Sequence, residues 1–429
     1  MPDDPATRDP ATAPRKPTLA RLFWEYLRIA AFVVGGGYAI IAVADETFGR
    51  RLRWLREGEL VDRLPVFQMI PGLIAGNSAI YVGLKLFGLA GAATALAAVA
   101  LPSFCIILAV AHGYAWLPMD SAVLQGAFLG LRSALAGVVA ATLVASWRRT
   151  MHGAYAWVAL VLGVAAMEGI GANPAHVLVA GMLLGIAWTC LRAARGRLPP
   201  PAEDAAAAEG AVFAERPVRR GLLLAALVCA AVAACAPAVF ATFAKFGLLC
   251  FGGGNVLVPV YIREFVGPGA PHLQLPPEDF GNLLAITQMT PGPISVNAAT
   301  FFGYRMEGAL GSFVATAGLL APSLLLLTLA LRSLAKWRRN PVVRGLLWGV
   351  APATVALMVV ATLVFARMSV FDGAVSLRIR PLALLLAVGA GWALHARRAH
   401  VTTLIVVCAA VGALLPRAIA WLLRFPPNP

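Results

Sequence analysis

Apolar segments long enough to cross a lipid bilayer recur along this 429-residue chain. A spanning helix needs about 20 predominantly apolar residues, and residues 88–111, 123–146 and 401–423 meet this requirement. Only 13% of all residues are charged, about half the usual share in soluble domains. A membrane β-barrel would alternate apolar and polar residues within segments of about ten residues, and this pattern is absent from the sequence. We therefore predict an all-α polytopic integral membrane protein in a lipid bilayer.

The net charge of +15 agrees with this class and does not indicate nucleic-acid binding. The arginines gather in short connections between apolar segments, where cytoplasmic Lys and Arg set the orientation, and no basic stripe with interleaved aromatic residues occurs. The six cysteines lie in apolar segments without a CxxC pair, so the pattern indicates neither a disulfide framework nor a metal site. Residues 1–19 lack the apolar core of a signal peptide, and we assign them to a cytoplasmic tail.

An internal duplication organises the chain. A shift of 217 residues places the triple glycine Gly35–Gly37 on Gly252–Gly254. A shift of 220 aligns LPVFQMIPGLIAGNSAIYVG (64–83) with LAITQMTPGPISVNAATFFG (284–303). We therefore predict two homologous repeats, each with a GGG motif followed by a PG motif. The second alignment pairs Gln68 with Gln288, Pro71 with Pro291, Gly72 with Gly292 and Asn77 with Asn297.

The two repeats are predicted to occupy residues 20–195 and 237–425. Residues 196–220, between them, are rich in proline, alanine and charge, which is typical of a flexible linker, and we place it in the cytoplasm. Residues 221–236 form an extra apolar segment with no counterpart before the first repeat. If this segment crosses the membrane, the second repeat is inserted upside down, and such inverted repeats are common in transporters.

The loop charges favour this inverted topology, with Arg367, Arg378 and Arg380 as exceptions. Between the GGG and PG motifs the first repeat carries five arginines, at positions 50, 51, 53, 56 and 63, whereas the second carries only Arg263. The five arginines are cytoplasmic if the GGG and PG segments are re-entrant or broken helices. We therefore predict breaks at both motifs, with arms of about 10–14 residues that each cross roughly half the bilayer.

Glycine and proline at these breaks predict an anion site. A broken helix frees backbone N–H groups at the N-terminus of the next arm, where the helix dipole also favours negative charge. The amides of Gln68, Gln288, Asn77 and Asn297 could each donate two hydrogen bonds. The alternatives are that the glycines only permit close helix packing and that the amides only join helices.

Basic and acidic residues near the breaks are few. Arg28 and Lys245 each lie seven residues before the first glycine of their GGG motif, on the same helical face. Basic residues inside membrane segments are costly and usually functional, although snorkelling to the interface is the alternative. Glu25, Glu59 and Glu264 could carry protons, but because most acidic residues lie near loops we expect solvated carboxylates.

The stretch FATFAKFGLLCFGGGNVLVPVY (240–261), followed by ITQMTPGPISVNAATFFGYRMEGALG (286–311), resembles the chromate ion transporter family in its two-domain form. The first repeat departs from this pattern with Leu73 in place of Pro293 and Val34 in place of Phe251. The resemblance implies export of chromate across the inner membrane, resistance to chromate, and sulfate as a competitor. By motif and repeat, the substrate-binding residues it implies are Arg28, Gly35, Gly36, Gly37, Gln68, Pro71, Gly72, Asn77, Lys245, Gly252, Gly253, Gly254, Gln288, Pro291, Gly292, Pro293 and Asn297.

We predict a secondary transporter without a cofactor, because the sequence has no phosphate-binding loop for ATP hydrolysis. The six histidines are scattered and form no HExxH motif, which argues against an intramembrane enzyme. A transporter of sulfate or another oxyanion and a passive anion channel are the alternatives. The sequence leaves open the coupling ion and the oligomeric state, a homo-oligomer included.

Overall fold

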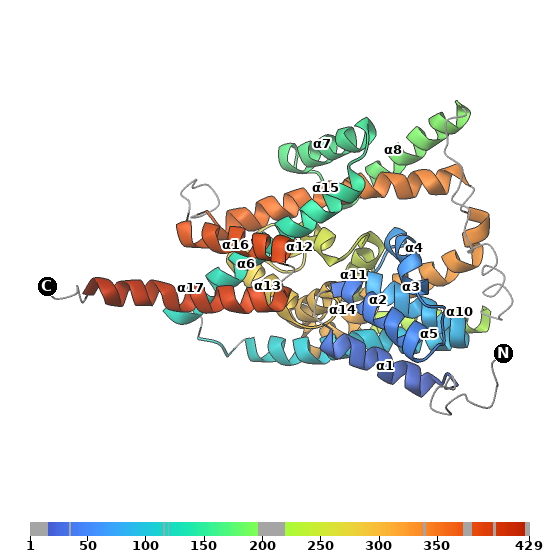
Figure 1. The fold of residues 1–429 in the computed structure, drawn as a ribbon, viewed down its shortest axis with the longest axis horizontal. Coiled ribbons are helices and arrows are strands. Elements are labelled where there is room, and N and C mark those ends of the chain that lie inside the picture. The colour runs from blue at the N-terminus through green and yellow to red at the C-terminus, as the bar shows by residue number, and fades with distance from the viewer. Residues whose placement is uncertain are drawn as a thin grey trace, which may run out of the picture.

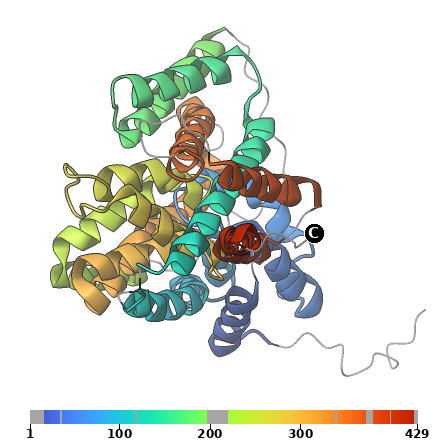
Figure 2. The ribbon, with the colours of Figure 1, turned by 90° about the vertical axis from the view of Figure 1, so that its left-hand side faces the viewer.

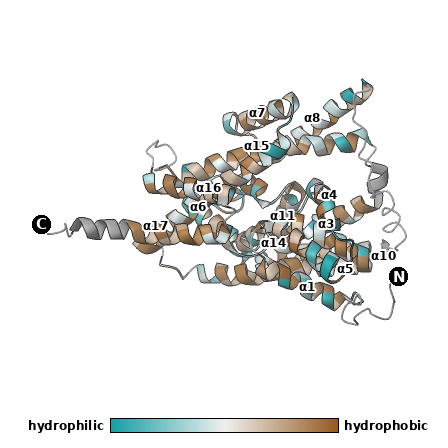
Figure 3. Ribbon diagram, viewed as in Figure 1, coloured by the Kyte–Doolittle hydropathy of each residue, from teal (hydrophilic) through white to brown (hydrophobic). Residues whose placement is uncertain are grey.

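The computed structural model describes residues 16–33, 36–114, 116–118, 120–195, 219–337, 340–371, 380–397 and 400–424. These residues are almost entirely helical and form no β-sheet. Five helices among them are long and apolar enough to cross a membrane, and Figure 3 shows apolar residues along most of their length. The predicted all-α membrane fold is therefore confirmed.

Within the described residues the first repeat contains nine helical elements, and the second contains eight, which follow one extra helix, α10 (Arg219–Cys235). In the predicted linker, residues 219–220 belong to α10 and the remainder lies outside the described residues. The first repeat comprises α1 (Leu19–Phe32), α2 (Gly36–Asp45), η3 (Glu46–Arg51), α3 (Glu59–Asp62), α4 (Leu64–Met69), α5 (Ile74–Tyr114), α6 (Ala122–Thr150), α7 (Ala154–Gly169) and α8 (Pro174–Ala194). The second comprises α11 (Pro237–Leu249), η4 (Gly254–Leu257), α12 (Val258–Phe265), α13 (Pro277–Met289), α14 (Ile294–Trp337), α15 (Pro341–Ser369), α16 (Pro381–Arg397) and α17 (Val401–Arg424).

Both predicted breaks are present in each repeat. The GGG motifs separate α1 from α2 and α11 from η4, and the PG motifs separate α4 from α5 and α13 from α14. At the second GGG motif, Gly252 and Gly253 have φ of +73° and +122°, and at the PG motifs Gly72 and Gly292 have φ of +125° and +100°. Side chains other than glycine rarely adopt such backbone angles, which explains why glycine stands at these positions.

The long helices α5 and α14 are helical hairpins rather than straight spans. Gly88 and Gly308, with φ of +67° and +60°, reverse the chain within them. A Cβ added to Gly303 would lie 2.5 Å from the carbonyl oxygen of Gly311, whereas residues eight apart in a straight helix are separated by about 12 Å. The arms are therefore packed against each other, and the apolar run predicted at 88–111 is the second arm of α5.

The two repeats are interleaved. Helix α8 of the first repeat packs along α15 of the second, and α17 of the second packs along α6 of the first, which crosses the middle of the molecule (Figures 1 and 2). On α15, Gly349 lies directly against the backbone of Gly181 in α8, and on α6, Gly130 lies directly against Cys408 in α17. Gly130 and Gly349 are corresponding positions of the duplication, so an approximate two-fold relation governs these contacts.

Candidate functional site

The breaks of the two repeats meet where the repeats cross. The backbone N–H of Gly72, in the first PG turn, donates to the carbonyl oxygen of Cys250, just before the second GGG motif (2.7 Å). A Cβ on Gly254 would lie 2.6 Å from Ser295 Oγ, and a Cβ on Gly37 would lie 3.2 Å from the backbone nitrogen of Ala75. The N-terminal ends of α2, α5, η4 and α14 are therefore close to one another, and each carries the positive end of a helix dipole.

Each PG turn packs on the second arm of the other repeat's hairpin. A Cβ on Gly292 would overlap the hydroxyl of Ser103 in α5, and one on Gly72 would overlap that of Ser323 in α14. Ser103 Oγ also donates to the carbonyl oxygen of Pro291 (3.1 Å). Only glycine fits at these two turns, because each serine reaches the position that a side chain would take.

The second GGG motif presents free backbone donors. Within the described part of the chain, Gly252, Gly253 and Gly254 donate their N–H groups to no acceptor. Gly252 is exposed, and the other two are partly exposed. In the first motif, Gly36 and Gly37 begin α2, whereas Gly35 lies outside the described residues. Pro71 and Pro291 are partly buried, and Pro293, which has no N–H, directly precedes α14.

The two glutamines make equivalent contacts. Gln68 Nε2 donates to the hydroxyl of Tyr38 (3.0 Å), and Gln288 Nε2 donates to Oδ1 of Asn255 (2.5 Å). Tyr38 and Asn255 are corresponding positions, each just after the last glycine of a GGG motif. Each glutamine therefore ties the helix before a PG turn to the start of the helix after a GGG motif.

The two asparagines close the PG breaks. Asn297 Nδ2 donates to the carbonyl oxygens of Thr287 (2.9 Å) and Thr290 (3.2 Å), and Asn77 does the same to Phe67 (2.9 Å) and Ile70 (3.1 Å). These are carbonyls at the C-terminal ends of α4 and α13 that a broken helix leaves unpaired. Because both amide hydrogens are occupied, Asn77 and Asn297 have none to offer an anion in this conformation, and their role here is to hold the break.

The basic residue on α11 is paired with a buried carboxylate. Lys245 Nζ pairs with Glu264 Oε1 of α12, and the other oxygen of Glu264 lies 3.6 Å from His272 Nε2. Glu264 is only 7% exposed. The expectation of solvated carboxylates is therefore wrong for Glu264, since the α11–α12 packing encloses it.

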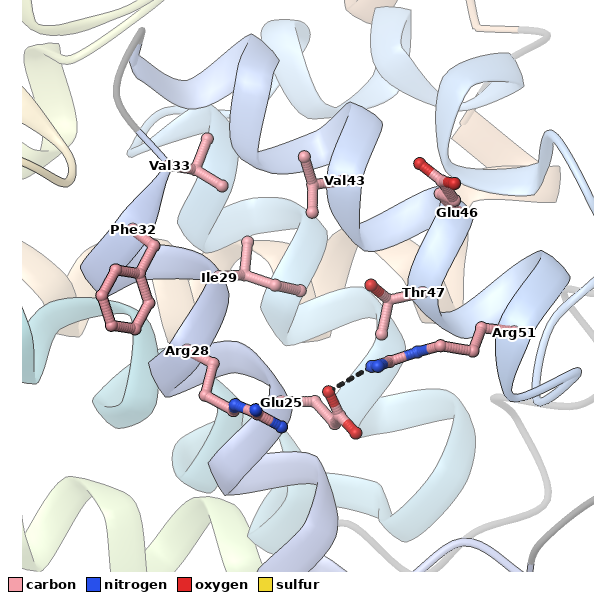
Figure 4. Close-up of a pocket in the computed structure, with 9 residues that line it drawn as sticks. All are labelled: Glu25, Arg28, Ile29, Phe32, Val33, Val43, Glu46, Thr47 and Arg51. Atoms are coloured by element: carbon pink, nitrogen blue, oxygen red, sulfur yellow. Dashed lines mark hydrogen bonds and ion pairs between the residues drawn. The ribbon is translucent and has the colours of Figure 1, made fainter.

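Arg28, on α1, lines a cavity of about 350 Å³ between α1, α2 and η3. Figure 4 shows Arg28 beside Glu25, whose carboxylate pairs with Arg51 at 2.5 Å. Glu25 is buried as well, so the expectation of a solvated carboxylate is wrong here too. The other residues that line the cavity are Ile29, Phe32, Val33, Val43, Glu46 and Thr47.

Glu59 is also buried, with 2% exposure. Its Oε1 accepts from Lys85 Nζ (2.5 Å) and Tyr81 Oη (2.6 Å), and its Oε2 accepts from the backbone N–H of Arg56 (3.0 Å). Burial alone would raise the pKa of Glu59, but these three hydrogen bonds favour the charged form and hold the pKa below its usual value. Glu59 thus anchors the arginine-rich segment to α5.

Replacing Glu59 with Gln is expected to lower the free energy of unfolding by about 1–3 kcal/mol, because Lys85 loses its charged partner. Since the folded-state pKa of Glu59 is depressed, its contribution is fully present above the pKa of an unfolded glutamate, about 4.3, and is lost as the pH falls through the folded-state value. Melting temperatures of the detergent-solubilised protein at several pH values measure this. A variant as stable as the wild type at neutral pH would contradict the assignment.

The architecture is that of an integral membrane protein made of two interleaved repeats whose broken helices meet at the centre. Residues 20–186 and 237–413 match the chromate transporter family. The two matched segments cover most of the chain and coincide with the two repeats. This protein belongs to the chromate transporter family.

Relatives of known sequence agree with this assignment. The chain is 25% identical over 380 residues to the chromate transport protein of Cupriavidus metallidurans, with 86% of this chain and 88% of the relative covered. It is 26% identical over 352 residues to the chromate transport protein of Pseudomonas aeruginosa, with 81% of each covered. The uncharacterized transporter YwrA of Bacillus subtilis is 32% identical over 124 residues, which is 29% of this chain and 68% of the relative. No solved structure matches the chain significantly.

Proposed function

We propose that this protein is a secondary transporter that exports chromate across the inner membrane and thereby confers chromate resistance. The observation that carries the proposal is the meeting of four helix N-termini from both repeats at the GGG and PG breaks. Two chromate transport proteins are among its relatives.

The chemistry of the breaks suits an oxyanion. The free N–H groups of Gly252–Gly254 and the dipole ends of the broken helices attract negative charge at a place where the backbone can be approached closely. Lys245 lies about two helical turns before these glycines. An incoming dianion would compete with Glu264 for Lys245, which offers a route to exchange or to coupling with protons.

The energy for export is available without ATP. Moving one charge through a membrane potential of 100 mV is worth about 2.3 kcal/mol, so a dianion leaving a negative-inside cell gains about 4.6 kcal/mol. Sulfate is also a tetrahedral dianion, and backbone N–H groups do not distinguish it from chromate. Transport of sulfate and passive conduction are therefore the alternatives that an experiment must separate from chromate export.

The test is uptake of labelled chromate into inside-out membrane vesicles that contain the protein, with and without an imposed potential or proton gradient. Excess sulfate serves as the competitor. We expect gradient-dependent chromate uptake that sulfate reduces. Uptake of sulfate alone would assign the other oxyanion, uptake only down the chromate gradient would indicate a channel, and uptake of neither anion would refute the proposal.

We also propose that the repeats have inverted topology, with the arginine-rich segment after η3 in the cytoplasm. The presence of helix α10 before the second repeat supports this arrangement, because one additional crossing reverses the orientation. A cysteine at position 53, in a variant without the native cysteines, is expected to resist a membrane-impermeant thiol reagent in intact cells. The same cysteine should react in inside-out vesicles. Labelling from outside intact cells would contradict the topology.

A further inference from the structure

A buried basic residue lies away from the helix breaks. Arg132, in the middle of α6, is 6% exposed, and its Nε and Nη1 atoms have no hydrogen-bond partner. Its side chain lies against the first turns of α13, because a Cβ on Gly281 would lie 2.9 Å from Arg132 Cδ. The nearest carboxylate that pairs with it, Glu278, is 3.8 Å away and its side chain is 70% exposed. Buried guanidinium N–H groups without an acceptor are strongly unfavourable, so the two unpaired nitrogens indicate a missing acceptor.

Two further buried polar side chains lie beside Arg132. Tyr114, at the end of α5, neighbours both Arg132 and Asn282 of α13. Tyr114 interacts with the Asn282 side chain, and the Oδ1 atom of Asn282 accepts no hydrogen bond. A half-turn of the Asn282 amide would present Nδ2 to the same space. The cluster can therefore supply several donors to one acceptor-only ligand.

Charged groups of both signs surround this cluster. Arg305, Arg380, Glu278 and Asp279 lie near Tyr114 or Arg132. Arg305 and Glu278 are exposed, so both can move when a ligand enters. An anion would accept from the unpaired N–H groups of the Arg132 guanidinium.

The corresponding place in the other repeat is built differently. The shift of 219 that pairs Gly130 with Gly349 places Ala351 at the position of Arg132. Glu59, which corresponds to Asp279, accepts hydrogen bonds from Lys85 and Tyr81, so the lysine beside it is paired. Only the interface between α6 and α13 therefore combines a buried cation with unpaired donors in the described part of the chain.

We propose that Arg132, Tyr114 and Asn282 form a second binding site, for a small oxyanion such as sulfate or chromate, at the N-terminal mouth of α13. Planar guanidinium groups bind oxyanions through several hydrogen bonds at once, and the start of a 13-residue helix adds its dipole. The site lies nine residues from Pro291, about 13 Å along the helix, and is therefore separate from the breaks. It goes beyond the proposed export function, because it concerns binding and not the direction of transport.

The test measures equilibrium binding of radiolabelled sulfate, and separately of chromate, to the full-length protein purified in detergent. Arg132→Gln is expected to lower the anion affinity of one class of sites by at least about tenfold, because a charge-assisted hydrogen-bond donor is lost. Glu278→Gln is expected to strengthen the same class several-fold, because the competing carboxylate is removed. Arg148→Gln, which removes an exposed arginine from the end of the same helix, is the matched control and should bind like the wild type.

Unchanged binding by Arg132→Gln would overturn the proposal, and so would the absence of any anion binding to the wild type. If Arg132→Gln does not fold, as judged by gel filtration, Glu278→Gln decides, because the Glu278 side chain is 70% exposed and its contact with Arg132 is long; unchanged affinity then overturns the site. Lys245→Ala is expected to leave anion binding at the Arg132 site unchanged. A loss of binding at the GGG and PG breaks can therefore be distinguished from a loss of binding at Arg132.

Discussion

Gly292→Ala is expected to abolish transport and to lower the free energy of unfolding by about 2–5 kcal/mol. Two costs add at this position. The added Cβ would overlap the hydroxyl of Ser103, and φ of +100° is unfavourable for alanine. Because this turn is where the PG break of one repeat meets the hairpin of the other, the collision would displace the helix ends that we assign to the anion site. Melting temperature and vesicle uptake measure the two effects.

A second substitution separates the steric overlap with Ser103 from the backbone strain at Gly292. In Gly292→Ala with Ser103→Ala, the hydroxyl is gone and the nearest remaining atom of residue 103 is its Cβ, at 3.1 Å. We expect this double variant to regain part of the stability, whereas the backbone strain remains. Gly269→Ala is the matched control, since a Cβ there has open space and no positive φ is involved. Wild-type stability and uptake in Gly292→Ala would show that the PG turn is not tightly packed.

Lys245→Ala and Gln288→Ala are each expected to reduce transport by at least about tenfold while leaving membrane expression intact. The basis is that a hydrogen bond to a charged ligand is worth about 1.5–3 kcal/mol. Gln68→Ala is the matched variant in the first repeat, and its comparison with Gln288→Ala shows whether both repeats bind the anion. The measurement is uptake of labelled chromate by vesicles that contain equal amounts of protein. Full transport by Lys245→Ala or by Gln288→Ala would show that the residue concerned has a structural role and does not bind the anion.

The ion pair between Lys245 and Glu264 allows a sharper test of the lysine. Lys245→Ala alone leaves the buried carboxylate of Glu264 without its ammonium partner, so a loss of activity could come from instability. The double variant Lys245→Ala with Glu264→Gln removes both charges and is expected to recover stability. If Lys245 binds the anion, transport stays lost in the double variant. If Lys245 only neutralises Glu264, transport returns, and its assignment to the substrate site is wrong.

Some parts of the site had a signal in the sequence and others had none. The duplication exposed Gln68 and Gln288 as a pair, and the structure gives them equivalent contacts with Tyr38 and Asn255. The same alignment marked Asn77 and Asn297, but their hydrogen bonds to the preceding carbonyls depend on how the chain turns. Arg132 stands inside an apolar run and has no counterpart in the other repeat, so the sequence marks it as unusual. Its role follows only from its contact with α13 in the structure.

The sequence by itself determined the membrane-spanning class, the duplication and the places where helices break. These features are local: apolar length decides spanning, glycine and proline decide the breaks, and lipid leaves the backbone no alternative to helix elsewhere. Only the tertiary structure decided that the repeats interleave, that α5 and α14 fold back on themselves, and that Glu25, Glu59 and Glu264 are enclosed. Those outcomes depend on contacts between distant residues, such as Ser103 with Pro291, 188 positions apart, and a contact of that kind leaves no periodicity or composition that a reading along the chain could detect.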